Sequence, residues 1–208
     1  MASDSILKGQ VFKALGVRAT FERARSSIPI HLGVMAPKAL ALAGEIADGV
    51  LLNSIVSPEF IRHACRQIQG GAERSGKKLE DFSMGAYLTL AMSRDERDAR
   101  NAVKPYIAMI IGALGLQLKL PIFAQAGITP EAAERFTQGL IRGEVAAHIV
   151  SETMIDVLAI AGSPERCRER LAEVVEAGVR SPTIFFPPQT DFAQAALNVA
   201  HHLFPYFL

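Results

Sequence analysis

The residue types that could do chemistry gather first in one turn, which consists of Gly33, Val34, Met35, Ala36, Pro37 and Lys38. The turn joins a short apolar run to a segment of helical periodicity, and its small residues let a ligand approach the backbone. A helix start offers unpaired N–H groups at the positive end of its dipole, which suits a phosphate. Lys38 could add a charge. The alternative is an ordinary turn, with Gly33 relieving crowding and Lys38 in solvent.

Two polar residues follow the next apolar run, and a histidine lies inside the first one. Asn53 and Ser54 come directly after Val50–Leu52, at the strand end where barrel enzymes place their active sites. They are candidate substrate or cofactor contacts, or else residues that form the turn before the next helix. His31 could contact substrate from a barrel interior, although a lone histidine in a strand is more often a packing residue.

No other constellation of reactive side chains stands out. No group of histidines, cysteines or carboxylates has the spacing of a metal site, so we expect no metal. The sequence has no Gly-x-Ser-x-Gly, Walker or Gly-x-Gly-x-x-Gly motif. His201 and His202 fall in a terminal helical segment, where we expect a structural role. Cys65 and Cys167 lie far apart in predicted helices, which argues against a disulfide and favours a reducing cytoplasm.

The elements that must position these residues alternate between strands and helices. Apolar runs predict strands at 28–33, 50–52, 83–91 and 182–186. Three helices begin with a hydroxyl residue, proline and glutamate, at 57–59, 129–131 and 163–165. Helical periodicity also begins at Pro37, at 94 with a kink expected at Pro105, at 151 and at 192.

This alternation predicts an α/β protein whose parallel sheet is wrapped by helices, either a (β/α) barrel or an open doubly wound sheet. About four parallel strands are evident, too few for a closed eight-stranded barrel. We expect one domain over 1–208, with a hairpin-like lead-in at 1–27 and a helical insertion at 94–162.

Composition excludes several partners. The 208 residues carry 22 basic and 21 acidic side chains without long runs of one sign, so a nucleic-acid partner is not expected. The most apolar window, 106–118, is too short to span a membrane, and the N-terminus lacks the pattern of a signal peptide. A mean hydropathy of +0.22 fits a large core or an apolar interface.

Four segments of the sequence carry a family resemblance. The segments that resemble the C-terminal half of the luciferase-like monooxygenases are KGQVFKALGVRATF at 8–21, IPIHLGVMAPKALALAGEIADGVLLN at 28–53, SPEF at 57–60 and AIAGSPERCRERLAEVVEAGV at 159–179. The most specific match is PKALALAGEIADGVLLN at 37–53. The similarity is strongest to the deazaflavin-dependent oxidoreductases that include methylenetetrahydromethanopterin reductase. The resemblance implies a partial (β/α)8 TIM barrel with family strands five to eight.

The resemblance also implies a cofactor and a reaction. It places the cofactor phosphate at Gly33–Lys38, with the deazaflavin coenzyme F420 as the first expectation and FMN as the alternative. A deazaflavin would mean hydride transfer, and FMN would mean monooxygenation. Nothing in the sequence matches family strands one to four, which supply much of the ring contact, so we expect this chain alone to lack part of the catalytic site.

Two further hypotheses differ in class. The chain could be a non-catalytic half-barrel remnant or assembly module, because unpaired sheet edges favour association with a second copy or a companion half-barrel. It could also be a small open-sheet enzyme of unrelated chemistry, although no nucleophile or acid–base constellation supports that interpretation.

Overall fold

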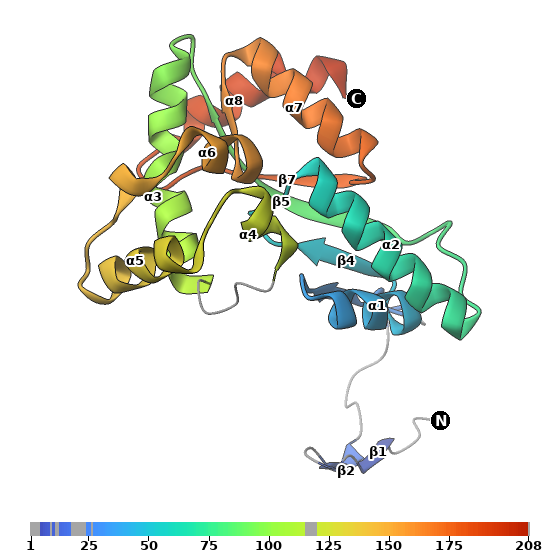
Figure 1. The fold of residues 1–208 in the computed structure, drawn as a ribbon. Helices are drawn as coiled ribbons and strands as arrows, with labels where there is room; N and C mark the ends of the chain where they lie inside the picture. The colour runs from blue at the N-terminus through green and yellow to red at the C-terminus, as the bar shows by residue number, and fades with distance from the viewer. Residues whose placement is uncertain are drawn as a thin grey trace.

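The computed structural model describes residues 5–8, 10, 13–17, 24–25, 27–114 and 120–207. Its centre is a parallel sheet (Figure 1) of five strands: β3 (His31–Gly33), β4 (Gly49–Leu52), β5 (Ser83–Met92), β6 (Ile160–Gly162) and β7 (Ser181–Phe185). The long strand β5 pairs with β4, β6 and β7, and β4 pairs with β3. Within the described residues the sheet does not close into a barrel.

Helices connect these strands and cover the sheet. They are α1 (Pro37–Ile46), α2 (Pro58–Ser75), α3 (Glu96–Leu114), α4 (Pro121–Gln125), α5 (Pro130–Ile141), α6 (Glu152–Leu158), α7 (Pro164–Glu176) and α8 (Phe192–His202). Two short 3-10 helices lie at Ala147–Ile149 and Phe204–Tyr206. Before the sheet, β1 (Ser5–Lys8) and β2 (Lys13–Val17) form an antiparallel pair, within the segment where a hairpin-like lead-in is expected.

The three hydroxyl-Pro-Glu sequences begin helices, as predicted. The side chains of Ser57, Thr129 and Ser163 accept hydrogen bonds from the N–H groups three residues later, at 3.0, 3.2 and 3.2 Å. These bonds satisfy donors that a helix start otherwise leaves unpaired. Proline at the first helical position has no N–H to satisfy, so the same sequence fixes where α2, α5 and α7 begin.

The two faces of the sheet differ in what covers them. On the covered face, Val50, Leu52, Met84, Ala86 and Leu88 are buried in the core beneath the helices. On the open face, the register aligns Gly33 with Leu51, Leu51 with Gly85, and Tyr87 with Thr183. We call these five residues the open face. Successive residues of a strand point to opposite sides, so both faces come from the same strands.

Helices α1 and α2 lie side by side over the covered face (Figure 1) and are in direct backbone contact. A Cβ added to Gly44 would lie 2.0 Å from the Ile68 carbonyl oxygen, and one added to Gly71 would lie 1.9 Å from that of Ala41. Only glycine permits this separation, so the two residues set how closely the helices pack.

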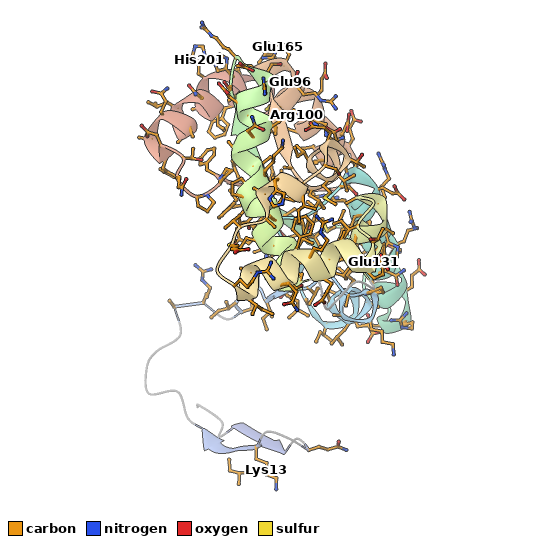
Figure 2. The ribbon with its side chains drawn as sticks, turned by 60° about the vertical axis from the view of Figure 1, so that its left-hand side comes forward. Lys13, Glu96, Arg100, Glu131, Glu165 and His201 are labelled. Carbon is orange, nitrogen blue, oxygen red and sulfur yellow. The ribbon has the colours of Figure 1, made fainter. Side chains whose placement is uncertain are left out.

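The structure differs from the predicted elements in several places. Strand β3 covers only 31–33 of the predicted 28–33, and the sequence patterns missed the three-residue strand β6. Within 94–162, the described residues before β6 form α3, α4, α5, a 3-10 helix and α6, and α3 continues through Pro105. Figure 2 shows Glu96 and Arg100 toward one end of α3, away from Glu131 on α5.

The sequence also led to expectations about a disulfide, a metal site and a membrane-spanning helix. Cys65 and Cys167 are both free thiols. Within the described parts of the chain, no cluster of histidine, cysteine or carboxylate side chains could hold a metal ion. No helix in those same parts is both long and apolar enough to cross a lipid bilayer.

Candidate cofactor site

A cavity of about 530 Å³ lies at the carboxyl ends of β3 and β4. The turn 33–36, Asn53 and Tyr87 line it, together with Leu51 and Leu52 of β4 and two leucines beyond β5, Leu114 and Leu120. The structure therefore brings two separately predicted groups, the turn and Asn53, to the wall of one cavity. Most of the wall is apolar, as in sites for planar organic cofactors.

The start of α1 has no side-chain cap, a feature that it shares with the short helix α4. Ala36 precedes the helix with no side-chain cap, Pro37 occupies the first position, and the first turn has no acidic residue. By contrast, α2, α5, α6, α7 and α8 are each capped by a serine, threonine or aspartate side chain. The first N–H groups of α1 thus remain available at the positive end of the helix.

Lys38 and Pro37 belong to the predicted anion-binding turn but do not line the cavity. Lys38 is exposed in the first turn of α1, where its charge adds to that of the helix end. Met35 has a specific contact, because the backbone N–H of Asn53 donates to its sulfur at 3.3 Å. This contact joins the turn after β3 to the end of β4.

Asn53 and Ser54 have different positions at the end of β4. Asn53 is exposed and lines the cavity, whereas Ser54 is buried and does not. The Ser54 N–H donates to the Asn53 side-chain oxygen at 2.6 Å, and its hydroxyl lies 3.1 Å from the same atom. Ser54 therefore does not line the cavity itself and instead contacts Asn53, which does.

A buried cluster of hydroxyl groups supports this strand end. The hydroxyls of Ser54 and Tyr106 are 2.7 Å apart, and Thr89 donates to the Ser54 carbonyl oxygen at 3.1 Å. The Tyr106 ring packs on Phe185 of β7 with ring centroids 4.6 Å apart. Because buried polar groups must be paired, these bonds fix α3 against the carboxyl ends of β4, β5 and β7.

His31 lies at the opposite end of β3 from the turn. It is aligned with Gly49 in the sheet, and a Cβ added to Gly49 would lie 2.9 Å from His31 Nε2. The imidazole thus packs on the Gly49 backbone and does not line the cavity. The substrate-binding role of His31 stays a prediction, and it would require a site other than this cavity.

Sequence reasoning missed Tyr87. Its side chain is 40% exposed on the open face and lines the cavity opposite the turn. The alternation in β5 was a usable signal, because it places Gly85, Tyr87 and Thr89 on one face while leucines occupy the other. What the alternation could not show is that this face meets the turn after β3.

The cysteines are poor candidates for nucleophiles. Burial raises the pKa of the Cys167 thiol to about 12 and also raises the pKa of Cys65 above its ordinary value. Both thiols therefore stay protonated at neutral pH, and the thiolate is the reactive form. Neither thiol lines the candidate cavity.

The parallel sheet, the helices that follow its strands and the cavity at its carboxyl edge define an α/β fold of the TIM-barrel type. The family model of the luciferase-like monooxygenases matches residues 5–181, and the chain belongs to this family.

Individual relatives show which members of the family the chain resembles. The chain is 32% identical over 185 residues to a 5,10-methylenetetrahydromethanopterin reductase from Methanopyrus kandleri, covering 88% of this chain and 51% of that protein. It is 29% identical to the reductase of that name from Archaeoglobus fulgidus, covering 95% and 59%. The chain spans about half the length of the curated relatives it matches.

Solved structures agree with the sequence relatives. The structure of coenzyme F420 dependent tetrahydromethanopterin reductase from Methanopyrus kandleri superposes with a TM-score of 0.81 at 29% identity, covering 97% of this chain and 58% of that one. An F420-dependent secondary alcohol dehydrogenase gives a TM-score of 0.67 at 15% identity, which supports the fold alone. The predicted family and the partial-barrel fold class are confirmed.

Proposed function

We propose that this chain forms the C-terminal half of an F420-dependent oxidoreductase barrel and binds the deazaflavin at the cavity beside the turn 33–36. The observation that carries the proposal is the position of the uncapped, positively polarised start of α1 beside that apolar cavity. A cofactor with a planar ring and an anionic tail would match both features, because the apolar wall suits the ring and the helix start suits the anion. The names of the relatives, reductases and a putative coenzyme F420-dependent oxidoreductase from Mycobacterium tuberculosis, support this choice of cofactor.

The residues of this chain would mainly position the cofactor. The N–H groups at the start of α1 would bind the phosphate, with Lys38 adding charge from the helix surface. Leu51 and Tyr87 would pack on the ring and keep water from one side of it. When bound, F420 would supply hydride transfer, so the protein need only fix the geometry and exclude water.

FMN is the alternative cofactor, with monooxygenation as the reaction. It also combines a planar ring with a phosphate, so the apolar wall and the helix start would suit it as well. The similarity to the coenzyme F420 dependent reductase of known structure and to the Mycobacterium tuberculosis protein favours the deazaflavin. We propose that the activity belongs to the cytoplasm, where the free thiols Cys65 and Cys167 would remain reduced.

A complete site needs a partner for the open face. In the described sheet β3 pairs only with β4, and β7 pairs only with β5, so each has a free edge. We propose that further strands, from a companion half-barrel or a second copy of the chain, pair with these edges and cover the cavity. The substrate would then bind between the two halves.

A second candidate function is a non-catalytic assembly module. The observation that favours it is the apolar exposure beside β3, where Ile28 is 74% and Ile30 is 60% exposed. Exposed apolar residues next to a free strand edge promote association. In this case the chain would self-associate without binding a flavin-type cofactor.

Titration of the purified chain separates the two functions. Oxidised F420 and FMN would be added separately while ring absorbance or fluorescence is followed, and light scattering on the same sample would give the association state. Saturable binding at about micromolar concentrations supports the cofactor site. A well-folded dimer or larger assembly that binds neither cofactor would overturn it and leave the assembly module.

A further inference from the structure

We propose that Asn53 presents only hydrogen-bond donors to the cavity and thereby selects a ligand with an acceptor oxygen at that point. The inference rests on the proposed function, because it assumes that the cavity next to Asn53 binds a flavin-type cofactor. It assigns the residue a direction of hydrogen bonding, which neither the sequence nor the family similarity supplies.

The orientation of the Asn53 carboxamide follows from the Ser54 backbone. The Ser54 N–H lies 2.6 Å from one polar atom of the Asn53 side chain. A backbone N–H can only donate, so the atom that it meets must be the carboxamide oxygen, Oδ1, and not the amino group. The amino group is therefore the other branch of the side chain.

The direction of the neighbouring hydroxyl bonds follows in turn. Ser54 Oγ lies 3.1 Å from the same Asn53 Oδ1, which can only accept, so the Ser54 proton points to Asn53. Ser54 Oγ must then accept from the Tyr106 hydroxyl, 2.7 Å away. The chain of donors runs from Tyr106 through Ser54 to Asn53 and ends on an oxygen whose two lone pairs are both used.

The two amide protons on Asn53 Nδ2 are what remains. They have no partner among the described residues, and Asn53 is exposed at the cavity wall. The side chain is held from both directions, because its own backbone N–H donates to Met35 and its oxygen accepts from Ser54. The buried positions of Ser54 and Tyr106 keep water from competing for these bonds.

An oriented donor at this position favours one class of ligand atom. Ring carbonyl oxygens and phosphate oxygens of a flavin-type cofactor are both acceptors and would be bound. A donor group of the ligand would face the amide protons without an acceptor and would lose its own hydrogen bond to water. Asn53 would thus act as a specificity residue rather than as an acid or base.

The variant that tests the direction is Asn53→Asp. A carboxylate keeps the oxygen that accepts from Ser54, so the strand end should stay intact, but it replaces the donor with an acceptor. We expect F420 binding to weaken about 10- to 100-fold while the melting temperature changes little. Asn101→Asp, at an exposed position on α3 outside the cavity, is the matched control for the added charge.

A second readout does not depend on affinity. The side-chain amide signals of Asn53 in a ¹⁵N-labelled sample are identified by their loss in Asn53→Asp, and they should shift when cofactor is added. Comparing F420 with its phosphate-free chromophore distinguishes the two acceptors. If Asn53→Asp also weakens binding of the phosphate-free chromophore, the acceptor is a ring oxygen. If it weakens binding of F420 only, the acceptor is the phosphate.

The outcomes separate this inference from the proposed function. If the unchanged chain binds F420 and Asn53→Asp binds it equally well, the donor role is wrong and the cofactor site stands. If the unchanged chain binds neither F420 nor FMN, the cofactor site itself is wrong, and the donor role that rests on it is overturned too. Weakened binding in Asn53→Asp but not in Asn101→Asp, with shifted Asn53 amide signals, supports both.

Discussion

The covered and open faces of the parallel sheet come from the same strands but are built for different purposes. Both leucines of β4 line the cavity, but Leu52 is fully buried in the core, whereas its neighbour Leu51 is only partly buried. Along β5, Leu88 is buried and Tyr87 is 40% exposed. A parallel sheet usually buries both of its faces, so the exposure of one side marks where a ligand or partner belongs.

The difference shows that burial and function divide between alternate residues of a strand. The covered face consists of aliphatic side chains that fill space under the helices. The open face combines glycines at 33 and 85 with Tyr87, which leaves room above the sheet. Substitutions on the first face should therefore change stability, and those on the second should change binding.

The largest effect should separate two consecutive leucines. Leu52→Ala removes a fully buried side chain and should lower the free energy of unfolding by about 2–5 kcal/mol, because a cavity remains in the core. Leu51→Ala should cost about 1 kcal/mol or less, since its side chain is already partly in solvent. Urea unfolding followed by circular dichroism measures both. Equal losses would show that the faces do not differ as described.

The contact between the covering helices gives a second matched pair. Gly71→Ala would place a Cβ 1.9 Å from the Ala41 carbonyl oxygen, so α1 and α2 must separate, at a cost of about 1–3 kcal/mol. At Gly70, the nearest atom to an added Cβ is a side-chain nitrogen of Arg74 at 3.9 Å. Gly70→Ala should instead stabilise α2 by up to about 1 kcal/mol. Thermal melting of the two variants decides whether the helix separation is set by Gly71.

A third test adds a cap to α1 at the edge of the open face. Ala36→Asp should stabilise the helix by about 0.5–2 kcal/mol, because Ala36 supplies no capping side chain. The same carboxylate would occupy the place proposed for the phosphate and should weaken F420 binding. Ala36→Ser caps without charge and is the control. Unchanged binding in Ala36→Asp would place the phosphate elsewhere.

The smallest effect concerns the outer surface, which belongs to neither face. The Arg100 guanidinium, 2.6 Å from Glu152, lowers the pKa of that carboxyl. A lowered folded-state pKa stabilises the protein above the unfolded value of about 4.3, and that contribution is lost as the pH falls through the folded-state pKa. Because Glu152 is largely exposed, we expect less than about 1 kcal/mol. The stability difference between the unchanged chain and Glu152→Gln should stay constant above about pH 5 and shrink as the pH falls below about 4.

Sequence patterns within a few residues were sufficient to predict most of the helices and strands. Hydroxyl-Pro-Glu sequences located α2, α5 and α7, because capping and the restricted φ of proline act within one turn. Strand β6 was missed because three apolar residues, 160–162, form a strand only by pairing with the end of β5. The same reason explains the short β3, whose pairing with β4 begins at His31.

For the site, the sequence predicted the turn and Asn53 but not how they meet. Tyr87 was missed because it is an ordinary residue of an alternating strand until the sheet is assembled. Ser54 was predicted as a contact, but it is buried next to Asn53 and does not line the cavity. The register placed Tyr87 at the cavity, and the hydroxyl of Tyr106, 52 residues away in sequence, gave Ser54 its buried partner. Contacts over such separations leave no periodic signal.

The sequence by itself determined four of the five strands of the parallel sheet, most helix starts and the family, since each depends on residues that are close in the chain or on similarity along it. Only the tertiary structure decided which face of the sheet stays open and that Leu51, Asn53 and Tyr87 share a cavity with the turn 33–36. It also decided that the Asn53 side-chain oxygen accepts from Ser54, because that contact depends on a backbone N–H and a hydroxyl whose positions are fixed by packing.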